Sequence, residues 1–576
     1  MFREPYFRCP IIFVSFVCFV VTFPFRGRQP ASFPFHLRQA EAAPRSGSNP
    51  LVSLRMKTSA SLFPLLAGLL AAASSVSAAI KPNALFSDHM VLQSGMAVPV
   101  WGTATPGEKV SVSLAGQKVS ATTAADGTWK AKLSKLQAGG PLEMIIAGDK
   151  GDAPLVIKDV LVGEVWLGSG QSNMEFVVSK AKGRPYGLIN EEQEIAAANY
   201  PQVRMFTVKA AKTYEPQTEI GGEWLVCNPE NVPGFSAVGY LFARNLNKEL
   251  NVPVGIVKSA FGASCAEAWI SREVMTADPK LKWMLDSLDA SVAYYRKTPQ
   301  GPAADAPIRP TPINKPRAKG PVTRLSDPVQ DQHFPTVLFN GMINPVIPYA
   351  IRGAIWYQGE SIIGGTPGLN LYGYVQRAMI TDWRKRWGEG NFPFYLVQLP
   401  GQENISNNPR IREEQASVLS LPDTRMAVTI DIGEAKDVHP HNKEPLGDRL
   451  TRLALADVYG RKIEYYGPMF EGMKISGHDA RIRFTHLGGG LVAKGGALKG
   501  FQIAGADQKF VDADVKIDGD MLVVSSAQVT TPVAVRYAWY NYPEGVGCNL
   551  YNAAGLPAAP FRTDKWDYPI AGIVEN

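Results

Sequence analysis

The sequence has 576 residues with 45% hydrophobic and 10% aromatic side chains, which is typical of a folded protein and excludes a largely disordered one. Because the chain is longer than one hydrophobic core ordinarily supports, two to four domains are expected. The net charge of +7 lies almost entirely in residues 1–78, and the remainder, with 51 basic and 50 acidic residues, gives no electrostatic reason to expect nucleic acid or an anionic membrane as a partner.

The first 78 residues contain the pattern of a secretory signal peptide, placed well inside the chain. Met56 and Lys57 precede an apolar stretch over residues 62–73, and a small-x-small site ends at Ala78. We therefore expect residues 1–55 to be a mis-called extension, translation to start at Met56, and the mature chain to be secreted or periplasmic. Residues 11–21 are an alternative signal or anchor. No later apolar run is long enough to span a bilayer.

Three cysteines follow the leader, namely Cys227, Cys265 and Cys548. Their number is odd and their spacing is not that of metal ligands, so one disulfide is allowed but a disulfide framework is not. The sequence therefore predicts no metal site and no cofactor.

Two regions at either end of the remaining chain show the alternation of β-strands. Residues 110–114 and 129–133 alternate apolar and polar side chains around a turn at 125–128, which indicates a small β-sandwich over 79–157. Similar short runs follow residue 463. We expect a second β-sandwich over 463–576, with strands near 480–484, 521–524 and 533–537.

The middle of the chain, residues 158–462, alternates apolar runs with amphipathic segments. This order predicts an α/β domain with a parallel sheet flanked by helices. The expected strands are 160–167, 254–258, 354–357, 392–399 and 426–430, and the clearest helices are 236–250, which opens with a serine N-cap, and 372–387.

Polar residues follow four of these apolar runs at the point where each strand should end. Ser172 follows the first run, a loop with Gly262 the second, Gln358 the third, and Asp437 with His439 the last. Ligands of open α/β sheets bind beyond the carboxyl ends of the strands. These residues are the parts of a serine hydrolase: a nucleophile, oxyanion donors, a base and an orienting carboxylate.

Each of these signals has a structural alternative. The Gly-Gln-Ser-Asn stretch could simply cap a helix, and it is not a Gly-x-Ser-x-Gly elbow because Met174 stands two residues after the serine. Gln358 and Glu360 could be satisfied polar residues at a strand end. His439 could be an ordinary loop histidine, and His441 lies equally near an acid. The prediction of a serine hydrolase site therefore depends on the combination of the four strand ends.

Three motifs together resemble the SGNH hydrolases, and in particular the sialate O-acetylesterase family. They are Gly-Gln-Ser-Asn-Met after a strand, Trp-Tyr-Gln-Gly-Glu-Ser at 356–361 and Asp-Val-His-Pro at 437–440. The resemblance covers about residues 80–460 and includes the stretches 85–93, 266–269, 340–342, 353–356 and 382–387. It implies an α/β fold of the SGNH type, a three-layer sandwich with a parallel sheet at 158–462, flanked by the two β-sandwich domains.

The resemblance also implies roles for individual residues. Ser172 would be the nucleophile and His439 its general base, while the Ser172 and Gly262 backbone N–H groups and the Gln358 side-chain amide would form the oxyanion hole. Many SGNH enzymes carry the acid three residues before the histidine, where this chain has Lys436. We favour Asp437 as the acid, with Glu434, Asp431 or a backbone carbonyl as alternatives.

The function implied is hydrolysis of O-acetyl esters of sialic acids, free or in sialoglycans, through an acetyl-enzyme. Candidate substrate contacts are Trp269, Arg352, Trp356, Tyr357 and Glu360. One alternative keeps the chemistry and changes the sugar, as in an acetylxylan or other polysaccharide deacetylase. Another is a carbohydrate-binding protein whose hydrolase fold is catalytically inactive.

Overall fold

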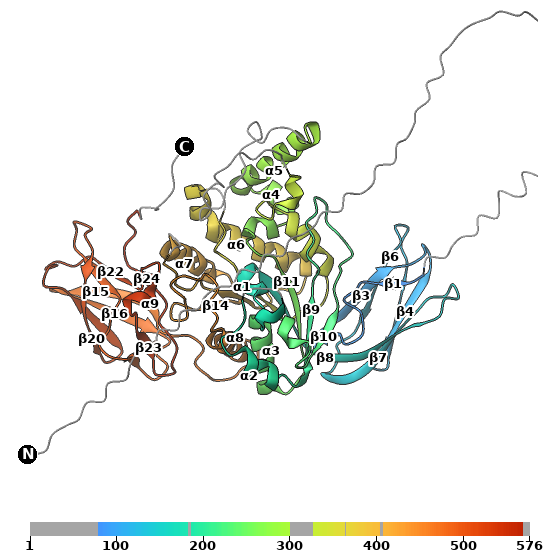
Figure 1. Ribbon diagram of the computed structural model, residues 1–576, viewed down its shortest axis with the longest axis horizontal. Helices are drawn as coiled ribbons and strands as arrows, with labels where there is room; N and C mark the ends of the chain where they lie inside the picture. The colour runs from blue at the N-terminus through green and yellow to red at the C-terminus, as the bar shows by residue number, and fades with distance from the viewer. Residues whose placement is uncertain (1–78, 183–185, 300–325, 363–364, 404–406, 568–576) are drawn as a thin grey trace, which may run out of the picture. The chain divides into compact units, whose positions relative to one another are not determined.

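The computed structural model describes residues 79–182, 186–299, 326–362, 365–403 and 407–567. The expected signal peptide at 56–78 lies outside these ranges. Within them the chain forms a mixed α/β structure with one large sheet and several smaller ones (Figure 1). No helix of the described residues combines the length and the apolar character needed to cross a membrane.

The large sheet contains the strands that the apolar runs predicted. Every neighbouring pair from β9 to β14 is parallel, whereas the edge strand β10 is antiparallel to β9, which makes the sheet mixed. Its order is β10 (Trp224–Cys227), β9 (Tyr200–Thr207), β11 (Val254–Ala260), β8 (Leu155–Gly170), β12 (Gly353–Tyr357), β13 (Phe394–Val397) and β14 (Thr424–Ala427). The parallel arrangement brings the carboxyl ends of β8, β11, β12 and β14 to one edge.

Helices connect these strands, and the two expected helices are confirmed. The Ser236 hydroxyl oxygen accepts a hydrogen bond from Gly239 N at 3.2 Å, so it caps α3 as predicted. Helix α3 packs against α8, and α6 packs against α7. The helices are α1 (Ser172–Glu175), α2 (Glu191–Ala197), α3 (Ala237–Leu250), α4 (Arg272–Ala277), α5 (Pro279–Lys297), α6 (Gly365–Trp387), α7 (Asn408–Ser417), α8 (Glu444–Asp457) and α9 (Pro543–Val546).

The N-terminal strands β2, β4, β5 and β7 are joined to the large sheet through β8, whereas β1, β3 and β6 form a separate three-stranded sheet. Strand β8 is 16 residues long; its first part contains several exposed residues, and its second part is buried on both faces. The first part pairs with β2 and β7, and the second part with β11 and β12. The remaining strands here are β1 (Lys81–Pro82), β2 (Val91–Gln93), β3 (Val98–Thr103), β4 (Lys109–Leu114), β5 (Gln117–Thr122), β6 (Thr128–Leu133) and β7 (Gly139–Ala147).

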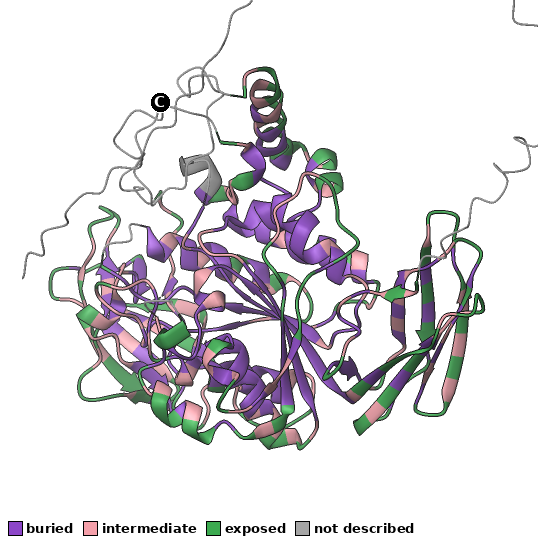
Figure 2. Ribbon diagram, turned by 45° about the vertical axis from the view of Figure 1, so that its right-hand side comes forward, coloured by how far each residue is buried: buried purple, intermediate pink, exposed green. Residues whose placement is uncertain are grey.

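The C-terminal strands form three small sheets around a hydrophobic cluster of their own. Val428 and Ile430, which follow β14, belong to this cluster rather than to that of the large sheet. Figure 2 shows the buried residues concentrated in the large sheet and its helices. The small sheets contain β15 (Met469–Ser476), β16 (Asp479–Thr485), β21 (Met521–Ser525) and β20 (Asp514–Asp518); β19 (Val511–Asp512), β18 (Phe501–Ala504), β22 (Ala534–Tyr537) and β24 (Phe561–Arg562); and β17 (Leu491–Ala493) with β23 (Leu550–Asn552).

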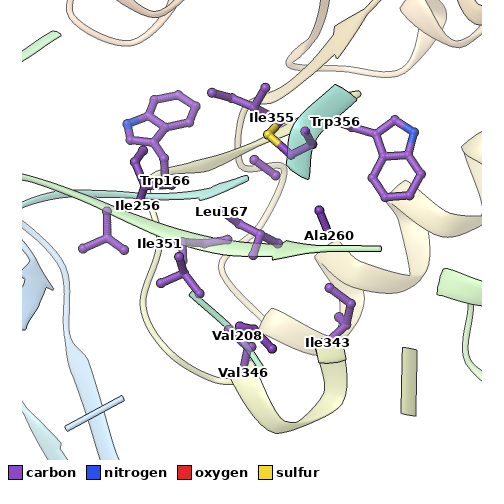
Figure 3. Packing of buried hydrophobic residues seen from close by; sticks show 14 of the residues in the cluster. Trp166, Leu167, Val208, Ile256, Ala260, Ile343, Val346, Ile351, Ile355 and Trp356 are labelled. Carbon is purple, nitrogen blue, oxygen red and sulfur yellow. The ribbon is translucent and has the colours of Figure 1, made fainter. Parts of the chain in front are cut away.

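Aromatic packing fixes the carboxyl end of β12. Figure 3 shows Trp356 and Trp166 among the buried side chains of β8, β11 and β12. The Trp356 ring meets the Trp269 ring at 5.9 Å and the Trp383 ring at 5.7 Å, both nearly perpendicular, which is a favourable aromatic geometry. A rigid core therefore lies directly below the strand ends that carry the predicted site.

Candidate active site

Ser172 lies at a sharp turn between β8 and α1. The last residue of the strand, Gly170, has a φ of +134°, and a Cβ there would lie 2.1 Å from Tyr357 O, so only glycine fits. Gln171 N donates to the same carbonyl at 2.9 Å, and α1 begins at once with Ser172. The backbone of β12 thus holds the serine at the carboxyl edge of the sheet.

His439 reaches Ser172 from the loop between β14 and α8. Its Nε2 lies 2.8 Å from Ser172 Oγ, which is hydrogen-bonding distance. The Tyr186 ring packs on the imidazole, with 4.3 Å between the ring centroids. Burial lowers the pKa of His439, and the positive charge of Lys443 lowers it further, against the opposing effect of Asp437. The imidazole is therefore biased toward the neutral form that can accept the serine proton.

Among the three carboxylates considered for the triad, Asp437 contacts the His439 ring. Its Oδ1 accepts a hydrogen bond from His439 N at 2.8 Å and lies 3.3 Å from His439 Nδ1, a longer contact. Asp431 forms a two-pronged ion pair with Arg449, at 2.7 Å for each oxygen. The geometry therefore favours Asp437 over Asp431.

The second histidine of the loop has a carboxylate of its own. His441 Nδ1 lies 3.0 Å from Glu434 Oε1, and the same oxygen accepts a hydrogen bond from His441 N at 2.7 Å. The side-chain ligand atoms of Glu434, Asp437 and His441 lie within 4.8 Å of one another. Hydrogen bonds to the loop engage each member of this cluster, so it is explained as internal support of the loop and we assign it no metal.

Gly262 lies beside the serine, as expected. A Cβ on Gly262 would lie 3.7 Å from the Ser172 Cβ and 2.9 Å from Glu175 Oε2. Sequence reasoning missed Glu175. The spacing of three residues from Ser172 would have placed both side chains on one face of the short helix α1.

The structure does not support the expected oxyanion role of Gln358. Its side chain is fully buried, and Nε2 donates to Ser264 O at 3.1 Å and to Ser361 O at 2.7 Å. Tyr372 Oη donates to its Oε1 at 2.6 Å. Both amide protons are therefore engaged, and Gln358 ties the loop after β11 to the loop after β12.

Four of the five predicted substrate contacts lie away from Ser172 or inside the core. Trp269, Trp356 and Tyr357 have no exposed surface, so they have no face to offer a sugar. Arg352 forms an ion pair with Glu164 at 2.6 Å, at the opposite end of β12 from the site. The three aromatic side chains therefore belong to the core, and Arg352 is engaged in an ion pair away from Ser172.

The fifth predicted contact, Glu360, belongs to a buried polar network behind the serine. Asn173 Nδ2 donates to Glu360 Oε1 at 2.6 Å and to Val438 O at 2.9 Å. Lys443 Nζ donates to Asn173 Oδ1 at 2.5 Å. Asn173 stood in the recognised motif without a role, and Lys443 gave no sequence signal because lysines are seldom fully buried.

The three cysteines of the described chain, Cys227, Cys265 and Cys548, form no disulfide, although their number allowed one. Burial raises the pKa of the Cys227 and Cys548 thiols to about 12. Thiolate chemistry at these two positions is therefore disfavoured.

Comparisons with known proteins find similar carbohydrate esterases. Residues 336–456 match the family described as "Carbohydrate esterase, sialic acid-specific acetylesterase". A Mus musculus protein named sialate O-acetylesterase is 30% identical over 521 residues, covering 82% of this chain and 92% of the relative. The Homo sapiens protein of the same name is 29% identical over 532 residues, covering 82% of this chain and 91% of its own length. A solved carbohydrate acetylesterase from Xanthomonas citri has 36% identity and a TM-score of 0.71, covering 84% of this chain and all of its own.

Proposed function

The chain belongs to the sialate O-acetylesterase family, and from this premise we propose that it hydrolyses O-acetyl esters of sialic acids with Ser172 as the nucleophile and His439 as the base. The 2.8 Å contact between Ser172 Oγ and His439 Nε2 is the observation that carries the proposal. Family membership makes the chain an esterase, so the alternative of an inactive carbohydrate-binding protein is set aside.

The mechanism that we propose has two steps. His439 Nε2 takes the proton of Ser172 Oγ as this oxygen bonds to the acetyl carbon. The bond to the sugar oxygen then breaks, and His439 returns the proton to that oxygen. Water next attacks the acetyl-serine while His439 takes a water proton, and Ser172 regains a proton as acetate leaves. Asp437 would hold the imidazole in the required tautomer and orientation.

Negative charge collects on the acetyl oxygen in both steps, and we propose that backbone donors stabilise it. Gly262 supports this role because its backbone lies beside Ser172, and the Ser172 N–H at the start of α1 is the second donor of the proposal. Losing one such donor typically lowers turnover about a hundredfold or more. Gln358 is not included, since its amide protons are engaged elsewhere.

Two kinds of acetylated sugar are compatible with this mechanism as substrates. The matched family and the mammalian relatives are named for sialic acid, which favours a sialic acid or sialoglycan as the substrate. The bacterial structure is named only as a carbohydrate acetylesterase, which supports the alternative of another acetylated polysaccharide, such as acetylxylan.

A paired substrate assay tests both levels of the proposal. Acetate release is measured from O-acetylated sialic acids, from acetylated xylan and from p-nitrophenyl acetate, with the wild type and with Ser172→Ala. We expect hydrolysis of the sialic acid ester and a loss of at least about a thousandfold in the variant. Equal rates in the two proteins would refute the nucleophile. Activity on acetylated xylan alone would refute sialic acid as the substrate sugar but would remain consistent with the serine esterase mechanism.

We also propose the finer architecture, a three-layer SGNH domain at 158–462 between β-sandwich domains at 79–157 and 463–576. The strands found in both flanking regions support this division, although β8 (Leu155–Gly170) crosses the boundary near 157 and belongs to both neighbours. Limited proteolysis with mass spectrometry tests it. Stable fragments that begin near 463 are expected, and early cleavage inside 158–462 would argue against it.

Export is a separate proposal, supported by the signal-peptide pattern over residues 56–78. Cleavage after Ala78 would leave a mature chain in the periplasm or outside the cell. Amino-terminal sequencing of the protein from both fractions tests this, and a mature terminus at Ala79 is expected. Recovery of the activity only in the cytoplasm, with the segment intact, would contradict export.

A further inference from the structure

A buried lysine stands behind the proposed catalytic pair, at the residue before α8. Its side chain is 1% exposed, and its ammonium lies 4.8 Å from the Phe176 ring centroid and 5.2 Å from that of Tyr357. A cation at a helix N-terminus opposes the helix dipole, and burying it costs solvation. Lys443 therefore occupies a position that stability alone does not favour.

The contacts of Lys443 lead directly to the histidine loop. Lys443 Nζ donates to Asn173 Oδ1, and Asn173 Nδ2 donates to Glu360 Oε1 at 2.6 Å and to Val438 O at 2.9 Å. Both oxygen and nitrogen of the Asn173 amide are thus engaged. Val438 precedes His439, and Asn173 follows Ser172, so one side chain connects the backbones that carry the proposed nucleophile and base.

From this geometry we infer that Lys443 is a positioning residue for the proposed ester hydrolysis: through Asn173 it locks the loop of His439 against Ser172, and its charge favours the neutral, proton-accepting imidazole. The inference rests on the proposed function.

The electrostatic part depends on every charged group near the two side chains. Those that face Lys443 are Glu360 from the loop after β12 and Glu434 and Asp437 from its own loop. Those that face His439 are Lys443, Asp437 and His441, with Ser172 and the Tyr186 ring in contact. Burial lowers the pKa of Lys443 to about 7, against the opposing charge of Glu360. The ammonium is therefore charged at the lower pH values where His439 takes up its proton.

The test compares two lysines of one loop. Lys443→Met removes the buried charge and its hydrogen bond while it keeps the length of the side chain, and Lys436→Met removes an exposed charge from the same loop. Hydrolysis of p-nitrophenyl acetate is followed from pH 4.5 to 9. For Lys443→Met we expect kcat to fall about tenfold to a hundredfold, KM to stay within about threefold, and the acid limb of the profile to move up by about half a pH unit. Lys436→Met should leave the rate and the limb unchanged.

A second variant covers the case in which Lys443→Met does not fold. Glu360→Gln keeps an oxygen for Asn173 and removes the negative charge that helps Lys443 to retain its proton. Lys443 should then be neutral at lower pH, so the acid limb should move up, as in Lys443→Met. A folded Lys443→Met variant with wild-type kcat would overturn the inference, and so would one with reduced kcat whose acid limb of the pH profile has not moved. An unmoved acid limb in Glu360→Gln would overturn it as well. Failure of the proposed function is distinguishable, because the wild type would then show no hydrolysis that depends on Ser172.

Discussion

The two side chains that meet at the proposed catalytic contact are held in different ways. Ser172 is held by backbone: Gly170 lies against the carbonyl of Tyr357, Gln171 N donates to that carbonyl at 2.9 Å, and Phe261 N donates to Gly170 O at 3.0 Å. Three neighbouring strand ends thus converge on one turn. The geometry of this turn follows mainly from the backbone of the sheet.

His439 depends more on side chains, because its loop between β14 and α8 has no strand or helix of its own. Backbone bonds reach this loop from Glu403 N to Ala435 O at 3.0 Å and from Ile189 N to His441 O at 3.1 Å. Asn173 secures the loop at Val438 O, and Glu544 of α9 accepts a hydrogen bond from Gly433 N at 2.5 Å. The second contact comes from the C-terminal part of the chain. A backbone-held nucleophile should fail only when the sheet is disturbed, whereas a side-chain-held base should respond to single substitutions at several distant positions.

The largest effect is expected where the backbone support of the nucleophile is broken. Gly170→Ala places a Cβ 2.1 Å from Tyr357 O at a φ of +134°, so the strand end must shift and carry Ser172 with it. We expect kcat/KM for p-nitrophenyl acetate to fall at least about a thousandfold, together with a lower melting temperature. Gly107→Ala is the matched control, since its φ is +77° and no atom lies within 4 Å of its Cβ position. Near-wild-type activity in Gly170→Ala would show that the turn is not what places the serine.

The next effect concerns the carboxylate that orients the base. Asp437→Asn keeps an acceptor for His439 N but removes the charge near Nδ1, and Asp437 raises the pKa of His439. We expect kcat/KM to fall about tenfold to a hundredfold, less than for a tightly bonded triad acid because the contact is 3.3 Å long. The acid limb should move to lower pH, since the neutral imidazole then persists further down the scale.

Glu434→Gln is the control for this substitution, because Glu434 is bonded to His441 rather than to His439. Its rate should stay within about threefold of wild type. A larger loss in Glu434→Gln than in Asp437→Asn would reverse the assignment of the triad acid.

The same difference explains which parts could be predicted from the sequence. Fully buried parallel strands appear as continuous apolar runs, so β8, β11, β12, β13 and β14 were each found, and polar residues after them marked Ser172 and His439. The two strands on the other side of the sheet, β9 and the edge strand β10, were missed. Polar residues interrupt the apolar side chains of β9, and β10 is short and partly exposed, so neither appears as a long continuous apolar run. Sequence motifs and hydrophobic periodicity report on short segments of the chain. The strands and turns that supply backbone support are such segments, so they could be predicted.

Side-chain support could not be predicted, because it depends on how distant segments pack. Gln358 and Trp356 stand in a recognised motif, yet one donates into neighbouring loops and the other is core. Lys443 and Glu544 lie in no motif, and Glu544 is more than 100 residues from the loop that it contacts. Residue type alone does not distinguish a buried supporting group from an exposed one.

A smaller effect should come from the C-terminal support of the histidine loop. Glu544→Ala removes the acceptor of Gly433 N, whereas Glu544→Gln keeps an oxygen at that place. We expect kcat to fall about threefold to tenfold in the alanine variant and to stay within about twofold of wild type in the glutamine variant. Burst titration of active sites separates fewer competent molecules from slower turnover. Equal losses in the two variants would point to the charge of Glu544 rather than to the hydrogen bond.

The loop after β11 is a third strand end, and a buried carboxyl tests how it is held. Glu267 is 1% exposed, and burial raises its pKa to about 7. Because its folded pKa lies above its ordinary value near 4.5, the native state binds more protons, and stability is lost as pH rises from about 4.5 to 7. Glu267→Gln imitates the protonated form. Its melting temperature should match wild type near pH 4.5 and exceed it by about 2–4 °C above pH 7.5, with turnover changed less than twofold. A melting-temperature difference that does not vary with pH would mean that burial does not raise the pKa of the Glu267 carboxyl. A large loss of turnover would mean that this loop, like that of His439, depends on side-chain contacts rather than on backbone.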